Sequence, residues 1–257
     1  MTQPADPAAT RVIAIGASNL TRGFHMFVAT ARAAWGQDVE IVTAQGLGRS
    51  FCGASRVHFR SLPGILDCGL WERLDSMPRV PTRAVVTDIG NDVMFGYSPA
   101  QILSRADECV VRLQEHTPDI TLTALPLVSI RSLSKSRYVL FRSILFPFSK
   151  MRLEQAVELA AEVDNALINL AFVRGVRLVI PRDEWYGIDP IHIRPGCWPA
   201  AWREILGCEP ATRPASSLGE ALRLYLMRPQ RRWIFGHEQL TPQTGARLPA
   251  GGRIWMY

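Results

Sequence analysis

Short runs of aliphatic and β-branched residues alternate along the chain with longer segments in which apolar residues recur at helical spacing. The short runs favour buried strands, and the longer segments favour amphipathic helices. The predicted strands cover residues 11–15, 39–44, 83–87, 120–125 and 176–180. The predicted helices cover residues 23–34, 64–75, 99–116 and 152–174. Gly175 directly follows the last helix, where a glycine commonly ends a helix.

Strands that alternate with helices predict an α/β fold, in which a parallel sheet is covered by helices on both faces. The length of 257 residues fits one large domain. We therefore expect a single domain over residues 1–257, with its core at about 10–228. Residues 229–257 are rich in Gly, Pro, Arg and Trp and have no helical period, which predicts a C-terminal arm or a hairpin packed on the sheet.

The composition narrows the class of protein. The formal net charge is +6, but the arginines are spread along the chain, so we expect a solvated basic surface and no specific nucleic-acid site. No apolar run is long enough for a transmembrane segment, and the first residues lack the features of a signal peptide, which predicts a cytoplasmic protein. The five cysteines are scattered without a C-x-x-C pair, so we predict neither a zinc site nor a redox site.

Reactive residues follow several of the predicted strands. Ser18 comes after the first strand, Gly48 after the second and Asn91 after the third, while Asp189 and His192 come after the fifth. We expect these groups at one edge of the sheet, because ligands collect at the carboxyl ends of parallel strands. Acyl transfer through serine needs a neutral imidazole, a carboxylate that fixes its tautomer, and N–H donors for the oxyanion. The set of residues therefore predicts a serine hydrolase.

Taken singly, each of these residues has an ordinary structural interpretation. Ser18 fits a helix N-cap, Asn91 fits a turn, and His192 fits a loop histidine between prolines. The pair Gly46 and Gly48 fits a dinucleotide-binding loop, but no third glycine completes that pattern. The catalytic interpretation depends on the order in which the residues occur.

Four motifs carry that order: GASNL at 16–20, QGLGRS at 45–50, IGND at 89–92 and DPIH at 189–192. In this order they resemble the SGNH/GDSL hydrolase superfamily. The resemblance implies a three-layer α/β/α sandwich with a five-stranded parallel sheet of flavodoxin-like type. It implies that Ser18 is the nucleophile, that His192 is the base and that Asp189 orients His192. The oxyanion hole would consist of the backbone N–H groups of Ser18 and Gly48 and the side-chain amide of Asn91.

Two positions depart from the family pattern. Ala17 stands where the family has an acid before the serine, and Asn19 stands where it has a leucine. Neither departure removes a group with a direct catalytic role. In the glycine motif, Gly48 lies closest to the expected distance after the strand, and Gly46 is the alternative donor.

The resemblance implies hydrolysis of a small-molecule or lipid-like carboxylic ester through an acyl-enzyme, without a metal or an organic cofactor. An acyltransferase would use the same residues. A binding module on a degenerate hydrolase fold is the non-enzymatic alternative, and the presence of all the catalytic positions favours an enzyme. The sequence leaves the oligomeric state open.

The segment 131–150 begins polar and continues as a run rich in aromatic residues from Tyr138 to Phe148. It follows the fourth predicted strand, whose carboxyl end lies at the expected catalytic edge. Two interpretations fit this segment. It is either an element that packs its apolar face on the core, or a flap over the active site that supplies apolar surface for a substrate chain.

Overall fold

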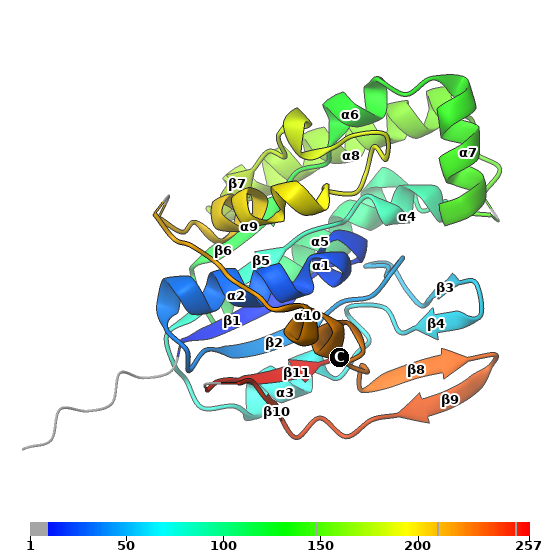
Figure 1. Ribbon diagram of the computed structural model, residues 1–257. Coiled ribbons are helices and arrows are strands. Elements are labelled where there is room, and N and C mark those ends of the chain that lie inside the picture. The colour runs from blue at the N-terminus through cyan, green and yellow to red at the C-terminus, as the bar shows by residue number, and fades with distance from the viewer. Residues whose placement is uncertain (1–9, 148, 210, 250) are drawn as a thin grey trace, which may run out of the picture.

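The computed structural model describes residues 10–147, 149–209, 211–249 and 251–257. A seven-stranded sheet forms its centre, with the strand order β10-β11-β2-β1-β5-β6-β7 (Figure 1). Five of these strands coincide closely with the predicted ones: β1 (Arg11–Ile15), β2 (Glu40–Ala44), β5 (Thr82–Val86), β6 (Ile120–Thr123) and β7 (Arg177–Val179). They pair in parallel throughout, so the predicted parallel sheet is confirmed.

The predicted number of five strands is wrong, because the C-terminal segment extends the sheet. Strand β11 (Arg253–Met256) pairs in parallel with β2, and β10 (Ala246–Arg247) pairs antiparallel with β11. Both faces of β11 are buried: Ile254 packs in one core cluster and Trp255 in the other. A four-residue strand that is buried on both faces has no alternation of apolar and polar residues. The local pattern therefore could not reveal it.

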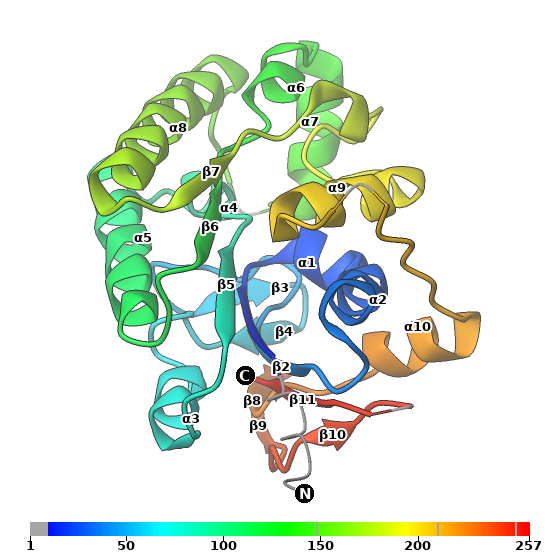
Figure 2. The same ribbon diagram turned by 90° about the vertical axis from the view of Figure 1, so that its left-hand side faces the viewer.

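Helices cover both faces of the sheet, as Figure 2 shows in end view. One face is covered by α3 (Leu70–Ser76), α5 (Pro99–Gln114) and α8 (Leu153–Arg174). The other is covered by α1 (Ser18–Arg22), α2 (Phe24–Trp35), α9 (Trp198–Leu206) and α10 (Leu218–Tyr225). Alternate residues of β1 contribute to the two cores, since Ile13 packs on the first face and Val12 on the second. The three-layer α/β/α sandwich is thus confirmed.

A second, four-stranded antiparallel sheet was not predicted. It joins β3 (Ser55–Val57) and β4 (Arg60–Leu62) to β8 (Arg231–Ile234) and β9 (His237–Leu240). Its first two strands have only three residues each, too few to show a period of two. The C-terminal segment therefore forms a hairpin in this sheet and then returns to the main sheet.

Short helices lie in the connections that follow the parallel strands. They are α4 (Asn91–Met94) after β5, α6 (Leu127–Arg131) and α7 (Lys135–Leu145) after β6, and the 3-10 turns η1 (Asp183–Trp185) and η2 (Pro195–Cys197) after β7. Helix α3 begins only at Leu70, because the preceding residues from Gly64 to Gly69 form turns. Within the described residues, no helix is both long and apolar enough to cross a membrane.

Candidate active site

Ser18 is the first residue of α1, directly after the turn that ends β1. The carboxylate of Asp88, at the end of β5, holds this turn. Its Oδ2 accepts hydrogen bonds from the backbone N–H groups of Ala17, Asn19 and Leu20 at 3.0, 2.9 and 3.1 Å. A negative charge at these otherwise unpaired N–H groups stabilises the start of the helix. Asp88 therefore fixes the backbone on both sides of Ser18.

Ser18, His192 and Asp189 form a chain of hydrogen bonds, although they lie far apart in the sequence. His192 Nε2 lies 2.9 Å from Ser18 Oγ, and His192 Nδ1 lies 2.6 Å from Asp189 Oδ2. The other carboxylate oxygen of Asp189 accepts from the backbone N–H groups of Ile191 and His192, both at 3.2 Å. Ser18 and His192 are buried, whereas the side chain of Asp189 is 31% exposed.

Asp189 lies in surroundings that favour its charged form. Burial acts to raise its pKa, but the hydrogen bond and charge of His192, the N–H group of Ile191 and the Arg22 guanidinium outweigh burial and lower the pKa below its ordinary value. Arg22 Nη1 lies 3.5 Å from Asp189 Oδ2. An ionised carboxylate beside Nδ1 favours the tautomer in which His192 Nε2 can accept the proton of Ser18.

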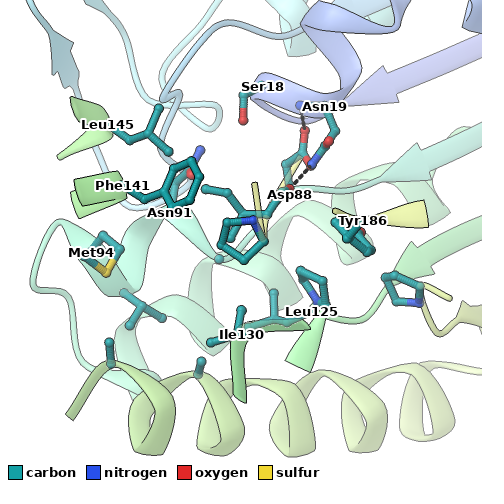
Figure 3. Close-up of a pocket in the computed structure, with 18 of the residues that line it drawn as sticks. Ser18, Asn19, Asp88, Asn91, Met94, Leu125, Ile130, Phe141, Leu145 and Tyr186 are labelled. Atoms are coloured by element: carbon teal, nitrogen blue, oxygen red, sulfur yellow. Dashed lines mark hydrogen bonds between the residues drawn. The ribbon is translucent and has the colours of Figure 1, made fainter. Parts of the chain in front are cut away.

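Asn19 joins the Ser18 turn to the His192 loop, and the sequence reasoning missed this role. Its Nδ2 donates to Asp88 Oδ1 at 2.7 Å and to the carbonyl of Ile191 at 2.9 Å, and its Oδ1 accepts from the N–H of Ile193 at 2.7 Å. Figure 3 shows the contact between Asn19 and Asp88. The signal in the sequence for Asn19 was that it departs from the leucine of the family pattern, and the signal for Asp88 was that it directly follows the third predicted strand.

Asn91 begins α4, and its side chain is buried beside the glycine loop at 46–48. Its Nδ2 lies 3.5 Å from the carbonyl of Arg49. The neighbouring Asp92 ties the same loop to α4, since its carboxylate accepts hydrogen bonds from the Ser50 hydroxyl and from the N–H of Phe51. The structure thus brings the Asn91 amide and the backbone around Gly48 together.

Gly48 and Gly46 differ in conformation. Gly48 has φ +65°, in the left-handed region that favours glycine, and Gly46 does not. A Cβ atom at either position would collide with a neighbouring side chain, Val57 for Gly48 and Leu62 for Gly46. Gly48 is also the residue next to Arg49, whose carbonyl lies near Asn91.

A largely apolar cavity opens from Ser18 and Asn91 (Figure 3). Its walls come from the ends of β5 and β6 and from α6, α7 and α8. From α7 and the residue after it, the cavity is lined by Tyr138, Phe141, Arg142, Leu145 and Phe146. Within the segment 131–150, the helix α7 forms one wall of this cavity. Phe148, at the end of the aromatic run, lies outside the described residues.

Within the described residues, no group of His, Cys, Asp or Glu side chains is arranged to hold a metal ion. The chemistry that this site offers comes from the serine, the imidazole, the carboxylate and the nearby N–H donors.

Comparison with known proteins gave no matching family model and no matching curated protein. Among solved structures, the chain is similar to an inhibitor-bound aryl esterase from M. smegmatis, with a TM-score of 0.52 and 14% identity over 78% of this chain and 100% of that chain. A member of the lipolytic G-D-S-L family from Veillonella parvula DSM 2008 has a TM-score of 0.47 and 10% identity, over 76% of this chain and 97% of that chain. TesA has a TM-score of 0.45 and 15% identity, over 77% of this chain and 96% of that chain.

Proposed function

Because the chain has the SGNH hydrolase fold, we propose that it is a serine hydrolase that cleaves carboxylic esters through an acyl-enzyme. The observation that supports this proposal most strongly is the pair of hydrogen bonds from Ser18 through His192 to Asp189, at 2.9 and 2.6 Å. A serine that only caps a helix needs neither a buried imidazole beside it nor a carboxylate behind that imidazole.

In the proposed reaction, Ser18 Oγ attacks the acyl carbon while His192 Nε2 takes the hydroxyl proton. Asp189 stays ionised and stabilises the imidazolium that forms. His192 then gives the proton to the departing alcohol oxygen, which leaves the acyl group on Ser18. A water molecule then attacks the acyl carbon while His192 takes a proton from the water. The bond between the acyl carbon and Ser18 Oγ breaks, His192 returns the proton to Oγ, and the carboxylic acid is released.

The negative oxygen of the tetrahedral intermediate needs donors that are already in place. We assign this role to the backbone N–H groups of Ser18 and Gly48 and to the side-chain amide of Asn91. Asp88 accepts hydrogen bonds from the N–H groups of Ala17, Asn19 and Leu20 but not from that of Ser18, which supports this assignment. The contact between Asn91 and the Arg49 carbonyl supports the inclusion of Gly48.

The cavity favours an ester with an apolar acyl chain, either a small molecule or a lipid-like compound. Leu125, Ile130, Phe141 and Leu145 are among the side chains that line it, and Ser18 lies at its edge. Burying an acyl chain there is favourable by about 0.8 kcal/mol per methylene group.

The test is a panel of chromogenic esters of increasing acyl length, measured with wild type and Ser18→Ala. Loss of a catalytic triad member typically costs about 10⁴ to 10⁶ in rate, so Ser18→Ala should lose essentially all turnover and all labelling by a fluorophosphonate. Ser136→Ala, at an exposed serine outside the cavity, is the control and should behave as wild type. Wild-type turnover in Ser18→Ala, with its melting temperature unchanged, would exclude the proposed mechanism.

A further inference from the structure

Helix α7 has two apolar faces, and only one of them is covered. Tyr138, Phe141 and Leu145 line the cavity. Val139, Leu140 and Ile144 point away from it and are 50%, 56% and 53% exposed. Leu140 and Ile144 are one helical turn apart and form an aliphatic stripe on the outer side of the helix, and Val139 flanks this stripe at about 100° around the helix from Leu140.

The segment around this stripe carries only positive charges. No Asp or Glu occurs between Asp119 and Glu154, and both lysines of the chain lie in this stretch. Its basic residues are Arg131, Lys135, Arg137, Arg142, Lys150 and Arg152. Four of these are exposed, namely Arg131, Lys135, Lys150 and Arg152.

Exposed apolar side chains alone do not distinguish α7 from other parts of the surface. Helix α10 and the residue that follows it also expose aliphatic side chains, with Leu222 at 57% and Leu226 at 64%. There, however, the charges are mixed, because Glu220 on the same helix pairs with Arg32. Helix α7 itself carries no acidic residue, although Lys135 pairs with Glu154 of α8 at 2.9 Å. The exposed aliphatic side chains together with the exposed basic residues Arg131, Lys150 and Arg152 distinguish α7.

We propose that the outer face of α7 docks on an anionic lipid surface. In this arrangement Val139, Leu140 and Ile144 enter the boundary between headgroups and acyl chains, and the exposed basic side chains contact lipid phosphates. A helix with a basic and an aliphatic face is suited to lie in the plane of such an interface. Docking rests on the proposed function in one respect only, namely that the cavity behind α7 accepts an acyl chain.

The position of α7 connects this surface to the active site. Arg137 of α7 donates hydrogen bonds to the carbonyls of Gly187 and Ile188, directly before Asp189. The side chain of Ile188 is 80% exposed, so it adds a further aliphatic group at the loop that α7 contacts. Helix α7 therefore joins the proposed docking face to the loop that carries Asp189.

The experiment measures co-sedimentation of the full chain with vesicles of ether-linked lipids, which contain no ester to be cleaved. Phosphatidylcholine vesicles are compared with vesicles of phosphatidylcholine and phosphatidylglycerol. We expect binding to the anionic vesicles only, released by high salt because screening weakens surface charges. Arg131→Gln with Lys150→Gln should weaken binding about 25-fold, since each basic group near such a surface contributes about fivefold.

A triple variant, Val139→Ser with Leu140→Ser and Ile144→Ser, tests the stripe and should abolish sedimentation. It should keep its melting temperature and its turnover of a short soluble ester, because these side chains are exposed and lie outside the cavity. Leu222→Ser with Leu226→Ser on α10 is the matched control and should bind as wild type. Ser18→Ala should also bind as wild type, so failure of docking and failure of the proposed chemistry are separable.

Three results would overturn the proposal. The first is no binding to anionic vesicles. The second is binding that the α7 variants leave unchanged, or that the α10 control reduces equally. The third is a shift from dimer to monomer in the α7 triple variant without any vesicle binding by wild type, which would make this face an interface between two copies of the chain.

Discussion

At the scale of single residues, Asn19 connects the two halves of the candidate site. Its amide group contacts the backbone on both sides of His192, through the carbonyl of Ile191 and the N–H of Ile193. The same amide also contacts Asp88, which holds the backbone around Ser18. A change at Asn19 would therefore alter the distance between Ser18 and His192. We infer that Asn19 is a positioning residue.

Asn19→Leu tests this inference with a side chain of similar size. It leaves the buried N–H of Ile193 without its partner, which typically costs about 1–3 kcal/mol of stability. We expect kcat for a short ester to fall by up to about 10²-fold with KM little changed, since small displacements of reacting groups have effects of that size. A lower melting temperature with unchanged kcat would mean that Asn19 only supports the fold. Thr21→Val, on the same helix but bonded only to the carbonyl of Ala17, is the control.

The pH dependence follows from Asp189. Because its pKa lies below its ordinary value, the carboxylate is ionised across the range from about pH 5 to 8. Protonation of Asp189 therefore does not change kcat/KM within that range. The contribution of ionised Asp189 to stability is present above the unfolded-state pKa and is lost as the pH falls through the lower folded-state pKa.

Asp189→Asn separates the effect of this carboxylate on catalysis from its effect on stability. At neutral pH it should lower kcat by about 10⁴-fold, because the carboxylate no longer fixes the tautomer of His192. The difference in unfolding free energy between wild type and Asp189→Asn should stay constant from about pH 8 to 5 and shrink only in more acidic solution. An unchanged kcat in Asp189→Asn would contradict this role of the carboxylate.

At the scale of elements, α7 combines the two interpretations that the sequence allowed. It is a helix, and its inner face forms a wall of the cavity rather than packing only on the core. Apolar residues occur on both of its faces, so the helical period could not show which face is buried. The position of the helix depends on contacts with α8, which follows it in the sequence.

Phe141→Ala tests whether this wall selects the acyl chain. In wild type we expect kcat/KM to rise about three- to fourfold per added carbon until the cavity is full, as burial of methylene groups predicts. Phe141→Ala should flatten this rise and leave acetyl esters nearly unaffected. Val139→Ala, an outward-facing change on the same helix, should keep the wild-type slope. Equal losses on short and long esters together with a lower melting temperature would mean that Phe141 serves only the core.

At the scale of the whole molecule, the predictable features are those that local patterns encode. The five strands of the parallel core were predicted because each is a short run of apolar residues between helices. Ser18, Asn91 and His192 could be proposed from the sequence because each follows such a strand in a recognisable order. The contacts of Asn19 could not be proposed from the sequence, because its partner Ile191 lies 172 residues away. The four-residue β11 was missed for a similar reason, since only its pairing with β2 makes it a strand.

The position of β11 bears on the number of domains. It pairs with β2 through its backbone, and Trp255 and Ile254 are buried in the two cores of the molecule. The hairpin β8–β9 likewise pairs with β4, which belongs to the first part of the chain. We propose that the segment from 229 to 257 folds as one unit with the preceding residues.

Trp255→Ala tests whether residues 229–257 unfold together with the rest of the chain. Trp255 is 2% exposed, and loss of a buried tryptophan typically costs about 3–5 kcal/mol. Urea unfolding is followed by circular dichroism and by loss of esterase activity. If the chain is one cooperative domain, the two transitions should coincide. Trp255→Ala should then shift both transitions to lower urea concentration by the same amount. Trp233→Ala, at a half-buried tryptophan of β8, should shift them less. Two separate transitions, with only the first moved by Trp255→Ala, would mean that the C-terminal strands unfold independently of the sheet that carries Ser18.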